Sequence, residues 1–477
     1  MPQDHNGMVA KKPSEIARER FAGKRVAVIG LAREGVSLAR FLAEAGADVV
    51  ANDRAPAAAL EKPLAALGDL PVRLVLGGHP QEVFLESDVV FVSPGVPQEL
   101  PPLAEARRQG IAISSETQLF FELCRGRLVG ITGSSGKTTT TALTGEMLRQ
   151  AGLPVYVGGN IGVPLLERVD EIEPGEWVVL EMSSFQLETL PYSPPVAAIL
   201  NITPNHLDRH ADMESYAAAK ANIVRHQGTE DWAILNADDR ITADIQGGGC
   251  TVWFSLERPV DGCYLEGERF LLRRTASVET VCEAGEVRLR GRHNLYNVAA
   301  AVAVASVVGA PVAAMRSAIG GFRGVPHRLE PVGVVDGVAY YNDSIATAPE
   351  RAMASLRSFE EPIVLIAGGR DKHLPMEEWG EMIRRRVKAL VLIGEAAGKI
   401  ERAVLDAPGG APPPMARVNS MEEAVALAWA SSAPGDVVLL APGCTSFDMF
   451  RDFEERGERF RECVRGLRGD PLEGERG

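Results

Sequence analysis

The stretch "RLVGITGSSGKTTTTALTGEML", residues 127–148, decides the fold of the chain around it. It begins as a short apolar run typical of a buried strand, turns through a segment with two glycines, and continues as a helical pattern. Backbone N–H groups in such a loop, together with a helix N-terminus, form an anion-binding site. We therefore expect a nucleoside triphosphate to bind at the residues of this loop: Gly133, Ser134, Ser135, Gly136, Lys137, Thr138 and Thr139.

The loop is shorter than the standard phosphate loop, G-x-x-x-x-G-K-[ST]. Ile131, and not a glycine, stands five positions before Gly136. The necessary groups are present, because Lys137 is placed to reach the outer phosphates and the Thr138 hydroxyl to bind Mg²⁺. The alternative is a simple glycine–serine turn with a solvated lysine.

The composition indicates a globular chain of about two to four domains, with 477 residues, 45% hydrophobic and 24% charged. The formal charge of −14 argues against a nucleic-acid or anionic-membrane partner. Six scattered cysteines without a CxxC pair predict reduced thiols rather than disulfides or a zinc site. We find no signal peptide and no apolar run of membrane-spanning length, so we expect a cytoplasmic protein.

Short apolar runs alternate with helical patterns along the whole chain, which predicts an α/β fold with parallel sheets. We expect three α/β domains, at residues 1–115, 116–324 and 325–477. The first and third resemble Rossmann-type units. The second contains the phosphate loop in a mostly parallel sheet, with a small antiparallel sheet around residues 250–292.

Three polar residues after the phosphate loop are candidates for chemistry. In "WVVLEMSSFQLE", residues 177–188, Glu181 ends a strand, which is the usual second position for Mg²⁺ in nucleotide-hydrolysing enzymes; a capping carboxylate is the alternative. His206 lies in a polar loop after the next strand, and a surface histidine explains it equally well. Lys220, on a helix, reads by itself as a solvated lysine.

The first glycine loop, "GLAREG" at residues 30–35, is weaker evidence for a ligand. A dinucleotide fingerprint requires a glycine where Ala32 stands, which argues against a nicotinamide oxidoreductase. Arg54, after the second strand, is suited to a phosphate, and Gly95 offers a turn for close approach. Ordinary turns between strands and helices explain both residues equally well.

Further polar residues follow later strands or open a helix. Asn294 and Asn297 lie three apart on one helix face, where their amides suit a base or a ribose, or cap the helix. The others have in common that each follows an apolar strand or the domain junction: Arg328, Asp343, Thr347, Lys372, Ser446 and Phe453. Open α/β sheets bind ligands at the carboxyl ends of their strands, so three such sheets facing one cleft would hold three substrates.

Together these motifs resemble the Mur ligase family, the ATP-dependent amide ligases of peptidoglycan precursor synthesis. The resemblance covers residues 24 to about 465. It rests on the phosphate loop with "GGNIG" (158–162), "SSFQLE" (183–188), "HNLYN" (293–297) and "NDS-AT" (342–347). Within the family, the motifs are similar to those of members that add D-glutamate to UDP-N-acetylmuramoyl-L-alanine.

The resemblance implies a role for each matching residue. Lys137, His206 and Lys220 would be catalytic, and Lys220 would be carbamylated by CO₂. Thr138 and Glu181 would bind one Mg²⁺, and His206 and Lys220 a second. The substrate contacts are implied at Asn294, Asn297, Arg328 and Asp343 for ATP; at Arg54, Gly95 and Asn160 for the UDP-sugar; and at Thr347, Lys372, Ser446 and Phe453 for D-glutamate.

The reaction that this resemblance implies joins the substrate carboxylate to D-glutamate through an acyl phosphate, with His206 a candidate to help deprotonate the amine. We expect a monomer. Ile345 departs from the family's frequent lysine, and Asn205 from a common acid. The alternatives are another ligase of the family, such as a folylpolyglutamate synthase, and a phosphate-loop kinase or regulatory ATPase.

Overall fold

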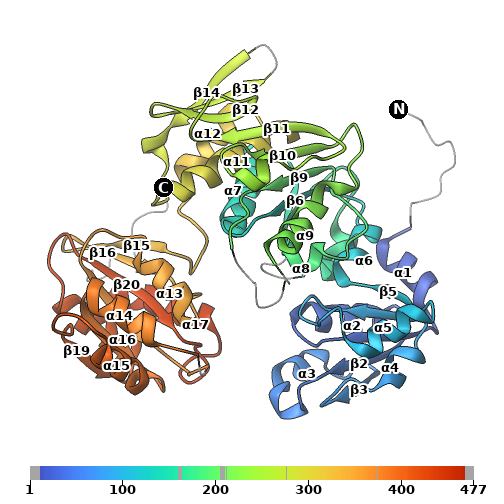
Figure 1. The fold of residues 1–477 in the computed structure, drawn as a ribbon, viewed down its shortest axis with the longest axis horizontal. Coiled ribbons are helices and arrows are strands. Elements are labelled where there is room, and N and C mark those ends of the chain that lie inside the picture. Colours follow the sequence, from blue (N-terminus) through green and yellow to red (C-terminus); the bar gives the residue numbers. More distant parts are fainter. Residues whose placement is uncertain are drawn as a thin grey trace. The chain divides into compact units, whose positions relative to one another are not determined.

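Three β-sheets organise the chain in the computed structural model, which describes residues 11–159, 164–204, 210, 212–274, 277–372 and 374–467 (Figure 1). The three α/β domains expected from the sequence are confirmed. The first two sheets belong to one compact unit, Met1–Val287 with Arg292–Gly321, and the third to a second unit, Arg288–Gly291 with the chain from Phe322 onward. The positions of the two predicted domain boundaries stay predictions.

The N-terminal sheet is fully parallel, in the order β3-β2-β1-β4-β5. Its strands are β1 (Arg25–Ile29), β2 (Asp48–Asp53), β3 (Val72–Leu76), β4 (Val89–Val92) and β5 (Ala112–Ser114). Its helices are α1 (Pro13–Phe21), α2 (Arg33–Glu44), η1 (Ala57–Ala59), α3 (Glu61–Leu67), α4 (Gln81–Leu85) and α5 (Pro101–Arg108). The strand order reverses between β1 and β4, and such a reversal is where open sheets of this kind bind ligands.

The central sheet has nine strands in the order β14-β13-β12-β11-β10-β9-β6-β8-β7 (Figure 1). They are β6 (Arg127–Thr132), β7 (Val155–Gly159), β8 (Trp177–Glu181), β9 (Val196–Ile199), β10 (Trp232–Asn236), β11 (Cys250–Ser255), β12 (Gly262–Glu266), β13 (Arg269–Arg274) and β14 (Ser277–Glu283). The antiparallel pairs are β12–β13 and β13–β14. In contrast, β11 runs parallel to β10, and β12 runs parallel to β11. Antiparallel strands are thus present in the region where a small antiparallel sheet was expected, but they continue one edge of the central sheet and do not form a sheet of their own.

Helices of the central domain include the two that carry the phosphate loop and Lys220. They are α6 (Glu116–Leu123), α7 (Lys137–Gln150), η2 (Leu165–Glu171), α8 (Ser184–Leu187), α9 (Met213–Arg225), α10 (Arg240–Ala243), η3 (Ala284–Glu286), α11 (Arg292–Val308) and α12 (Val312–Gly321). Within the described residues, no helix combines the length and the apolar character that crossing a membrane requires.

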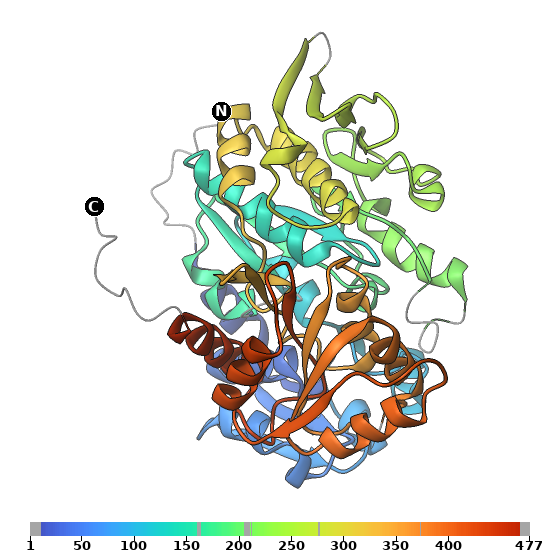
Figure 2. The ribbon, with the colours of Figure 1, turned by 90° about the vertical axis from the view of Figure 1, so that its left-hand side faces the viewer.

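The C-terminal sheet has the order β15-β16-β20-β17-β18-β19, with β15 antiparallel to β16 and the other pairs parallel. Its strands are β15 (Glu330–Val335), β16 (Val338–Asn342), β17 (Ile363–Gly368), β18 (Val387–Ile393), β19 (Met415–Val418) and β20 (Val437–Gly443). Its helices are α13 (Pro349–Leu356), α14 (Glu377–Arg386), α15 (Ala397–Asp406), α16 (Met421–Ala430) and α17 (Phe453–Gly466). The last helix, dark red in Figure 2, lies along one side of this sheet.

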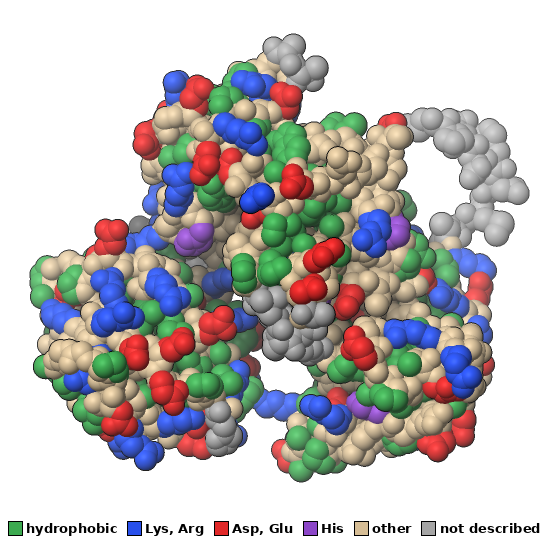
Figure 3. Space-filling model, viewed as in Figure 1, with side chains coloured by type: hydrophobic (Ala, Val, Ile, Leu, Met, Phe, Trp, Pro, Cys, Tyr) green, Lys and Arg blue, Asp and Glu red, His purple; other side chains and the backbone are tan. Residues whose placement is uncertain are grey.

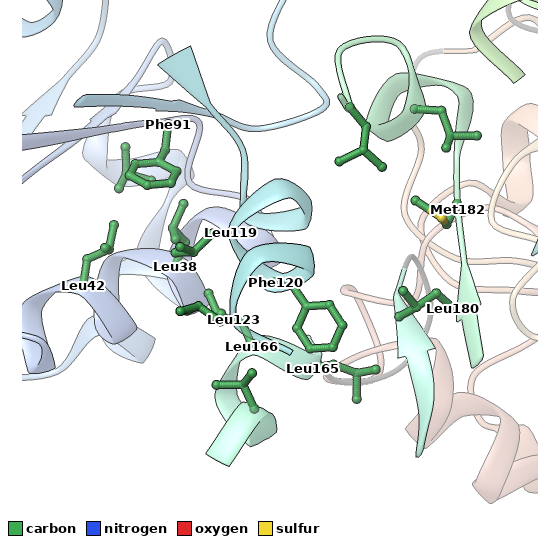
Figure 4. Packing of buried hydrophobic residues seen from close by; sticks show 14 of the residues in the cluster. Leu38, Leu42, Phe91, Leu119, Phe120, Leu123, Leu165, Leu166, Leu180 and Met182 are labelled. Atoms are coloured by element: carbon green, nitrogen blue, oxygen red, sulfur yellow. The ribbon is translucent and has the colours of Figure 1, made fainter. Parts of the chain in front are cut away.

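One apolar core joins the N-terminal and central domains. Helix α6 buries Leu119, Phe120 and Leu123, and Figure 4 shows them between Leu38 of α2 and Leu180 of β8. Burying a leucine or phenylalanine fully is worth about 1.5–3 kcal/mol, so this helix contributes substantially to holding the two domains together. In the C-terminal unit, separate apolar clusters form around the β-sheet. On the face shown in Figure 3, positive and negative side chains are interspersed.

Candidate active site

The phosphate loop turns sharply between the end of β6 and the start of α7. Gly136 caps the helix with a φ of 84°, a conformation that favours glycine. A Cβ atom at Gly136 would lie 2.1 Å from Oδ1 of Asn297, so α11 also closes the space above it. At Gly133, a Cβ would lie 2.9 Å from Cβ of Leu200. The two glycines of the motif are thus required by conformation and by close packing.

Residues after β9 hold the loop in place. The Ser134 N–H donates to the Asn201 carbonyl at 2.9 Å, and the Ser135 N–H to the Asn201 side-chain oxygen, also at 2.9 Å. The Ser134 hydroxyl donates to the Thr203 carbonyl at 3.0 Å and accepts from the Tyr216 hydroxyl at 3.1 Å. In this arrangement Ser134 and Ser135, which the sequence places among the ATP contacts, shape the loop.

Two lysines converge on one carbonyl oxygen of this loop. Nζ of Lys137 and Nζ of Lys220 each donate to the Gly133 carbonyl at 2.9 Å. Lys220 reaches it from α9, where its side chain is 1% exposed and its ammonium lies 4.7 Å from the centroid of the Tyr216 ring. Burial, and then the charge of Lys137, lower the pKa of Lys220 to about 7, against the opposing effect of Glu181. Near neutral pH, a large fraction of Lys220 is therefore an uncharged amine.

Glu181 ends β8 beside the loop. Its backbone pairs with Ile131 of β6 on one side and with Gly159 of β7 on the other. The residue is only 3% exposed, and a Cβ on Gly159 would lie 2.4 Å from the Glu181 carbonyl oxygen. The structure thus brings Lys137, Glu181 and Lys220 to one edge of the central sheet. His206 lies outside the described residues.

The donors at this edge fit Mg²⁺. Thr138 is buried in the first turn of α7, so a hydroxyl and the Glu181 carboxylate lie near the same loop. Among the described residues, no three Asp, Glu, His or Cys side chains gather as a metal-binding group. Proteins usually hold Mg²⁺ through one or two carboxylates together with water and substrate phosphates.

The two asparagines of α11 lie beside the phosphate loop. Asn297 is buried, packs over Gly136, and donates to Oδ1 of Asn294 at 2.9 Å. The helix begins at Arg292, so Asn297 lies inside it, and the capping alternative does not apply to this residue. Asn294 is in the first turn.

In the N-terminal domain, three strand ends are tied together at the reversal of the strand order. The Leu31 N–H donates to Asp53 at 2.7 Å, and the Ser93 hydroxyl donates to the Gly30 carbonyl at 2.9 Å. Asp53 is therefore used to hold the first glycine loop. Arg54 follows it and is exposed, as is Gly95 after β4, while Asn160 lies outside the described residues.

A half-buried pair of carboxyl groups was missed from the sequence. Glu34 of α2 and Glu116 of α6 line a cavity with Glu181. Gln186 of α8 donates to Oε1 of Glu34 at 2.9 Å. Burial raises the pKa of Glu34 to about 7, and burial followed by the charge of Glu34 raises the pKa of Glu116 to about 8. In the sequence, both glutamates look like ordinary polar residues beside a loop. No local pattern shows that two acidic residues far apart in the sequence lie close together in the fold.

In the second unit, Asp343 anchors the turn at its start. The Leu329 N–H donates to Oδ1 of Asp343 at 3.0 Å, and the Ser355 hydroxyl donates to its other oxygen. Burial raises the pKa of Asp343. His327 and Leu329 have positive φ angles of 63° and 43°, so the turn around Arg328 is held in a strained conformation.

The residues expected to receive an amino acid lie after strands of the C-terminal sheet. Lys372 is exposed, and its Nζ donates to the Thr347 hydroxyl at 3.4 Å. Partial shielding of its ammonium from water, then Arg351 and more weakly Arg456, lower the pKa of Lys372. Ser446 is buried after β20, and Phe453 opens α17 with its ring 6.0 Å from that of His327.

Comparison with known proteins gives consistent matches along the chain. Three family descriptions match: "Mur ligase MurD-like, N-terminal domain" over residues 24–115, "Mur ligase middle domain" over 131–305, and "Mur ligase, glutamate ligase domain" over 327–444. A UDP-N-acetylmuramoylalanine–D-glutamate ligase of Symbiobacterium thermophilum is 46% identical over 93% of this chain and 98% of that protein. A ligase of the same name from Solibacter usitatus is 43% identical over 94% and 99%. The solved UDP-N-acetylmuramate–alanine ligase of Thermotoga maritima aligns with a TM-score of 0.55 at 18% identity, over 93% of this chain and 99% of that one, which indicates a shared fold.

Proposed function

The chain belongs to the Mur ligase family, and we propose that it joins D-glutamate to UDP-N-acetylmuramoyl-L-alanine while ATP is converted to ADP and phosphate. The names of relatives that match over nearly their full length support this substrate pair. The observation that carries the proposal is the convergence of Lys137 and Lys220 on the Gly133 carbonyl, beside the buried Glu181. Such a cluster suits the transfer of a phosphoryl group.

We assign one substrate to each domain. Residues 1–115 bind the UDP-sugar, with Arg54, Gly95 and Asn160 along it. Residues 116–324 bind ATP through the phosphate loop, Asn294 and Asn297, with Arg328 and Asp343 contributing from the next domain. Residues 325–477 bind D-glutamate through Thr347, Lys372, Ser446 and Phe453. We propose a cytoplasmic location for the reaction, which the use of ATP and of a nucleotide-linked precursor supports.

The first step brings two anions together. A substrate carboxylate oxygen attacks the γ-phosphorus of ATP, giving an acyl phosphate and ADP. Like charges repel strongly at short range in a site of low dielectric. Lys137 and the N-terminus of α7 reduce this repulsion by stabilising charge on the phosphoryl group. Mg²⁺, held by Thr138 and Glu181 at one site and by His206 and Lys220 at a second, would supply further positive charge.

In the second step, the uncharged amine of D-glutamate attacks the acyl carbon. A tetrahedral intermediate forms and then expels phosphate, leaving the new amide bond. His206 is our candidate for accepting the proton that the amine loses. Most of the remaining reduction of the activation barrier comes from positioning, since the acyl phosphate and the amine must approach each other at a defined distance and angle.

The environment of Lys220 supports its carbamylation. An uncharged lysine amine adds to CO₂, releases a proton and becomes an anionic carbamate. The lowered pKa of Lys220, about 7, makes the uncharged amine available near neutral pH. The product carries oxygen donors of the kind that Mg²⁺ prefers, and it replaces two repelling ammonium groups at the Gly133 carbonyl with an attracting pair.

Phosphate release tests this function. We expect phosphate only when ATP, UDP-N-acetylmuramoyl-L-alanine and D-glutamate are all present, together with an amide product in equal amount. Phosphate or ADP formed without an amino acid would indicate a kinase or regulatory ATPase. Ligation of another acid, such as a folate, in place of the UDP-sugar would indicate a different ligase of the family.

A further inference from the structure

Arg456 is the most deeply buried cation of the C-terminal unit. It lies in the first turns of α17 and is 0% exposed. Its guanidinium donates to the hydroxyl of Ser344 at 2.9 Å and to the carbonyl of the same residue at 2.8 Å. It also donates to the carbonyls of Cys444 at 3.1 Å and Gly368 at 3.5 Å. One side chain therefore uses all three of its nitrogen atoms.

These acceptors belong to three different strand ends. Ser344 follows β16, Cys444 follows β20, and Gly368 ends β17. The three strands are neighbours in the order β16-β20-β17 and run parallel, so their carboxyl ends lie at one edge of the sheet. The packing is close, because a Cβ on Gly369 would lie 3.1 Å from Nη1 of Arg456. Arg456 thus fastens together the loops that leave this edge.

The charge of Arg456 is balanced only in part, by the nearby Asp448, whose negative charge opposes the effect of burial on the pKa of Arg456. None of its hydrogen bonds within the described part of the chain goes to a carboxylate. Burying a cation among neutral acceptors is costly, and neutral side chains are sufficient to fasten loops. Burial lowers the pKa of Arg456 to about 10, so it remains charged at neutral pH. A fixed positive charge is thus maintained under this edge of the sheet.

Each loop that Arg456 holds carries a residue of the proposed D-glutamate site. Thr347 lies three residues after Ser344, and Ser446 two residues after Cys444. Lys372 lies four residues after Gly368. The charge of Arg456 also reaches this group, because it acts with Arg351 in lowering the pKa of Lys372. The anchor and the proposed ligand-binding residues are therefore parts of one structure.

We propose that Arg456 is a positioning residue for the amino-acid substrate: it sets the spacing of the loops that carry Thr347, Lys372 and Ser446, and its buried charge attracts the substrate carboxylate. This inference rests on the proposed function. Arg456 itself is enclosed and does not touch the substrate. Its effect therefore belongs to the binding of D-glutamate and is separable from the binding of ATP.

The test compares Arg456→Gln, which keeps hydrogen-bond donors but loses the charge, with Arg456→Lys, which keeps the charge. Phosphate release is measured with each of the three substrates varied in turn. We expect Arg456→Gln to raise the KM for D-glutamate about tenfold or more, with the KM for ATP changed less than about twofold. Arg456→Lys should retain a lower KM for D-glutamate than Arg456→Gln.

Arg384 provides a matched control. It also donates to several backbone carbonyls, those of Gly410, Val404 and Leu405, but at the end of α14 that precedes β18, the opposite edge of the same sheet. We expect Arg384→Gln to lower the melting temperature and leave the KM for D-glutamate unchanged. An equal rise in all three KM values for Arg456→Gln, or no difference between its Lys and Gln variants, would overturn the proposal.

If Arg456→Gln does not fold, a double-mutant cycle tests whether Arg456 positions the loops of the D-glutamate site. Ser344→Ala removes the hydroxyl that accepts from Nε of Arg456. When combined with Arg456→Lys, it should raise the KM for D-glutamate by less than the product of the two single effects, because both changes break one contact. Independent effects would contradict the proposed coupling. If the wild-type protein ligates no D-glutamate, the proposed function fails first; if it does and these variants show no selective effect, only this inference fails.

Discussion

At the residue scale, the site is defined by charges that the fold holds in unfavourable places. Lys220 is buried, faces Lys137 across one carbonyl oxygen, and receives compensation only in part from Glu181. Functional sites often keep such groups at a cost in stability. Replacing them should therefore separate stability from activity.

Lys220→Met should stabilise the protein and abolish ligation. In metal-free buffer depleted of CO₂, we expect a gain of about 1–3 kcal/mol in the free energy of unfolding at pH 6.5. The folded-state pKa of Lys220 lies below its ordinary value of 10.5, so between pH about 7 and 10.5 the unfolded chain binds more protons than the folded one. The gain should therefore shrink as the pH rises through this window.

Urea unfolding at pH 6.5 and 10 measures this difference. The exposed Lys24, changed to Met, serves as the control and should show no such dependence on pH. A Lys220→Met protein that is less stable than the wild type at pH 6.5 would show that the ammonium is well accommodated, and the argument for its reactivity would fail.

Lys137→Ala should leave the fold intact and remove activity. The side chain lies in the first turn of α7 and is only half-buried, so its loss leaves the apolar core unchanged. Its charge is assigned to the transferring phosphoryl group, where loss of one such interaction costs about 10²–10³-fold in rate. Phosphate release and circular dichroism measure the two effects. Robust ATP-dependent ligation by this variant would refute the assignment of the loop.

The positions of the candidate residues in the fold were predictable only where a local sequence pattern indicated them. The phosphate loop, Glu181 at a strand end and the asparagine pair follow from periodicity and spacing. Lys220 had no local signal, and its role came from the resemblance alone. The pairing of Glu34 with Glu116 was not predictable, because the two residues are distant in sequence and meet only when α2 packs near α6.

At the scale of elements, close packing between α7 and α11 fixes the phosphate loop. Gly136→Ala should destabilise the protein by about 1–3 kcal/mol, because alanine disfavours its φ of 84° and its Cβ meets Oδ1 of Asn297. Thermal unfolding measures this cost. Adding Asn297→Ala removes the clash but not the backbone strain, so it should restore part of the lost stability. Full tolerance of Gly136→Ala alone would contradict the packing described.

The carboxyl pair between α2 and α6 should make stability depend on pH. The folded-state pKa of Glu116, about 8, lies above its ordinary value of 4.5, so the folded protein binds protons more tightly in this window. The stability of the wild type should therefore fall as the pH rises from about 5 to 8. Glu116→Gln removes the ionisation and should be more stable than the wild type by about 1–3 kcal/mol at pH 8.5.

Denaturant titrations of Glu116→Gln at pH 5 and pH 8.5 check the sign. At pH 5 the two proteins should differ little, because the wild-type carboxyl is protonated there. The exposed Glu61, changed to Gln, is the control and should show no gain at high pH. A gain for Glu116→Gln that is larger at pH 5 than at pH 8.5 would contradict the protonation described.

Element types were largely predictable, and their pairing was less so. The apolar runs ending at Glu181, Asn342 and Gly443 are strands, as their length and composition indicate. The segment at residues 250–292 illustrates this contrast between element type and strand pairing. Its strands were expected, but they extend the central sheet, and two of them, β11 and β12, pair in parallel. The composition of a segment predicts that it forms a strand. Which strand it pairs with depends on contacts between residues that are distant in sequence.

At the scale of the whole molecule, the order of the three domains was predictable because each repeats the alternation of strand and helix. The apolar core that joins the first two through α6 was not, since Leu119, Phe120 and Leu123 do not differ in sequence from the buried face of any helix. Three sheets that each present polar residues at the carboxyl ends of their strands suit a reaction with three substrates.

The central claim is that this chain activates a carboxylate by phosphorylation before an amine attacks it. Isotope transfer tests it most directly. UDP-N-acetylmuramoyl-L-alanine with ¹⁸O at both oxygens of its terminal carboxylate is incubated with ATP, Mg²⁺ and D-glutamate, and the phosphate released is analysed by mass spectrometry. The account predicts one ¹⁸O atom in each phosphate, because the oxygen that attacks the γ-phosphorus leaves with it. Phosphate released in step with amide formation but without ¹⁸O would contradict the account.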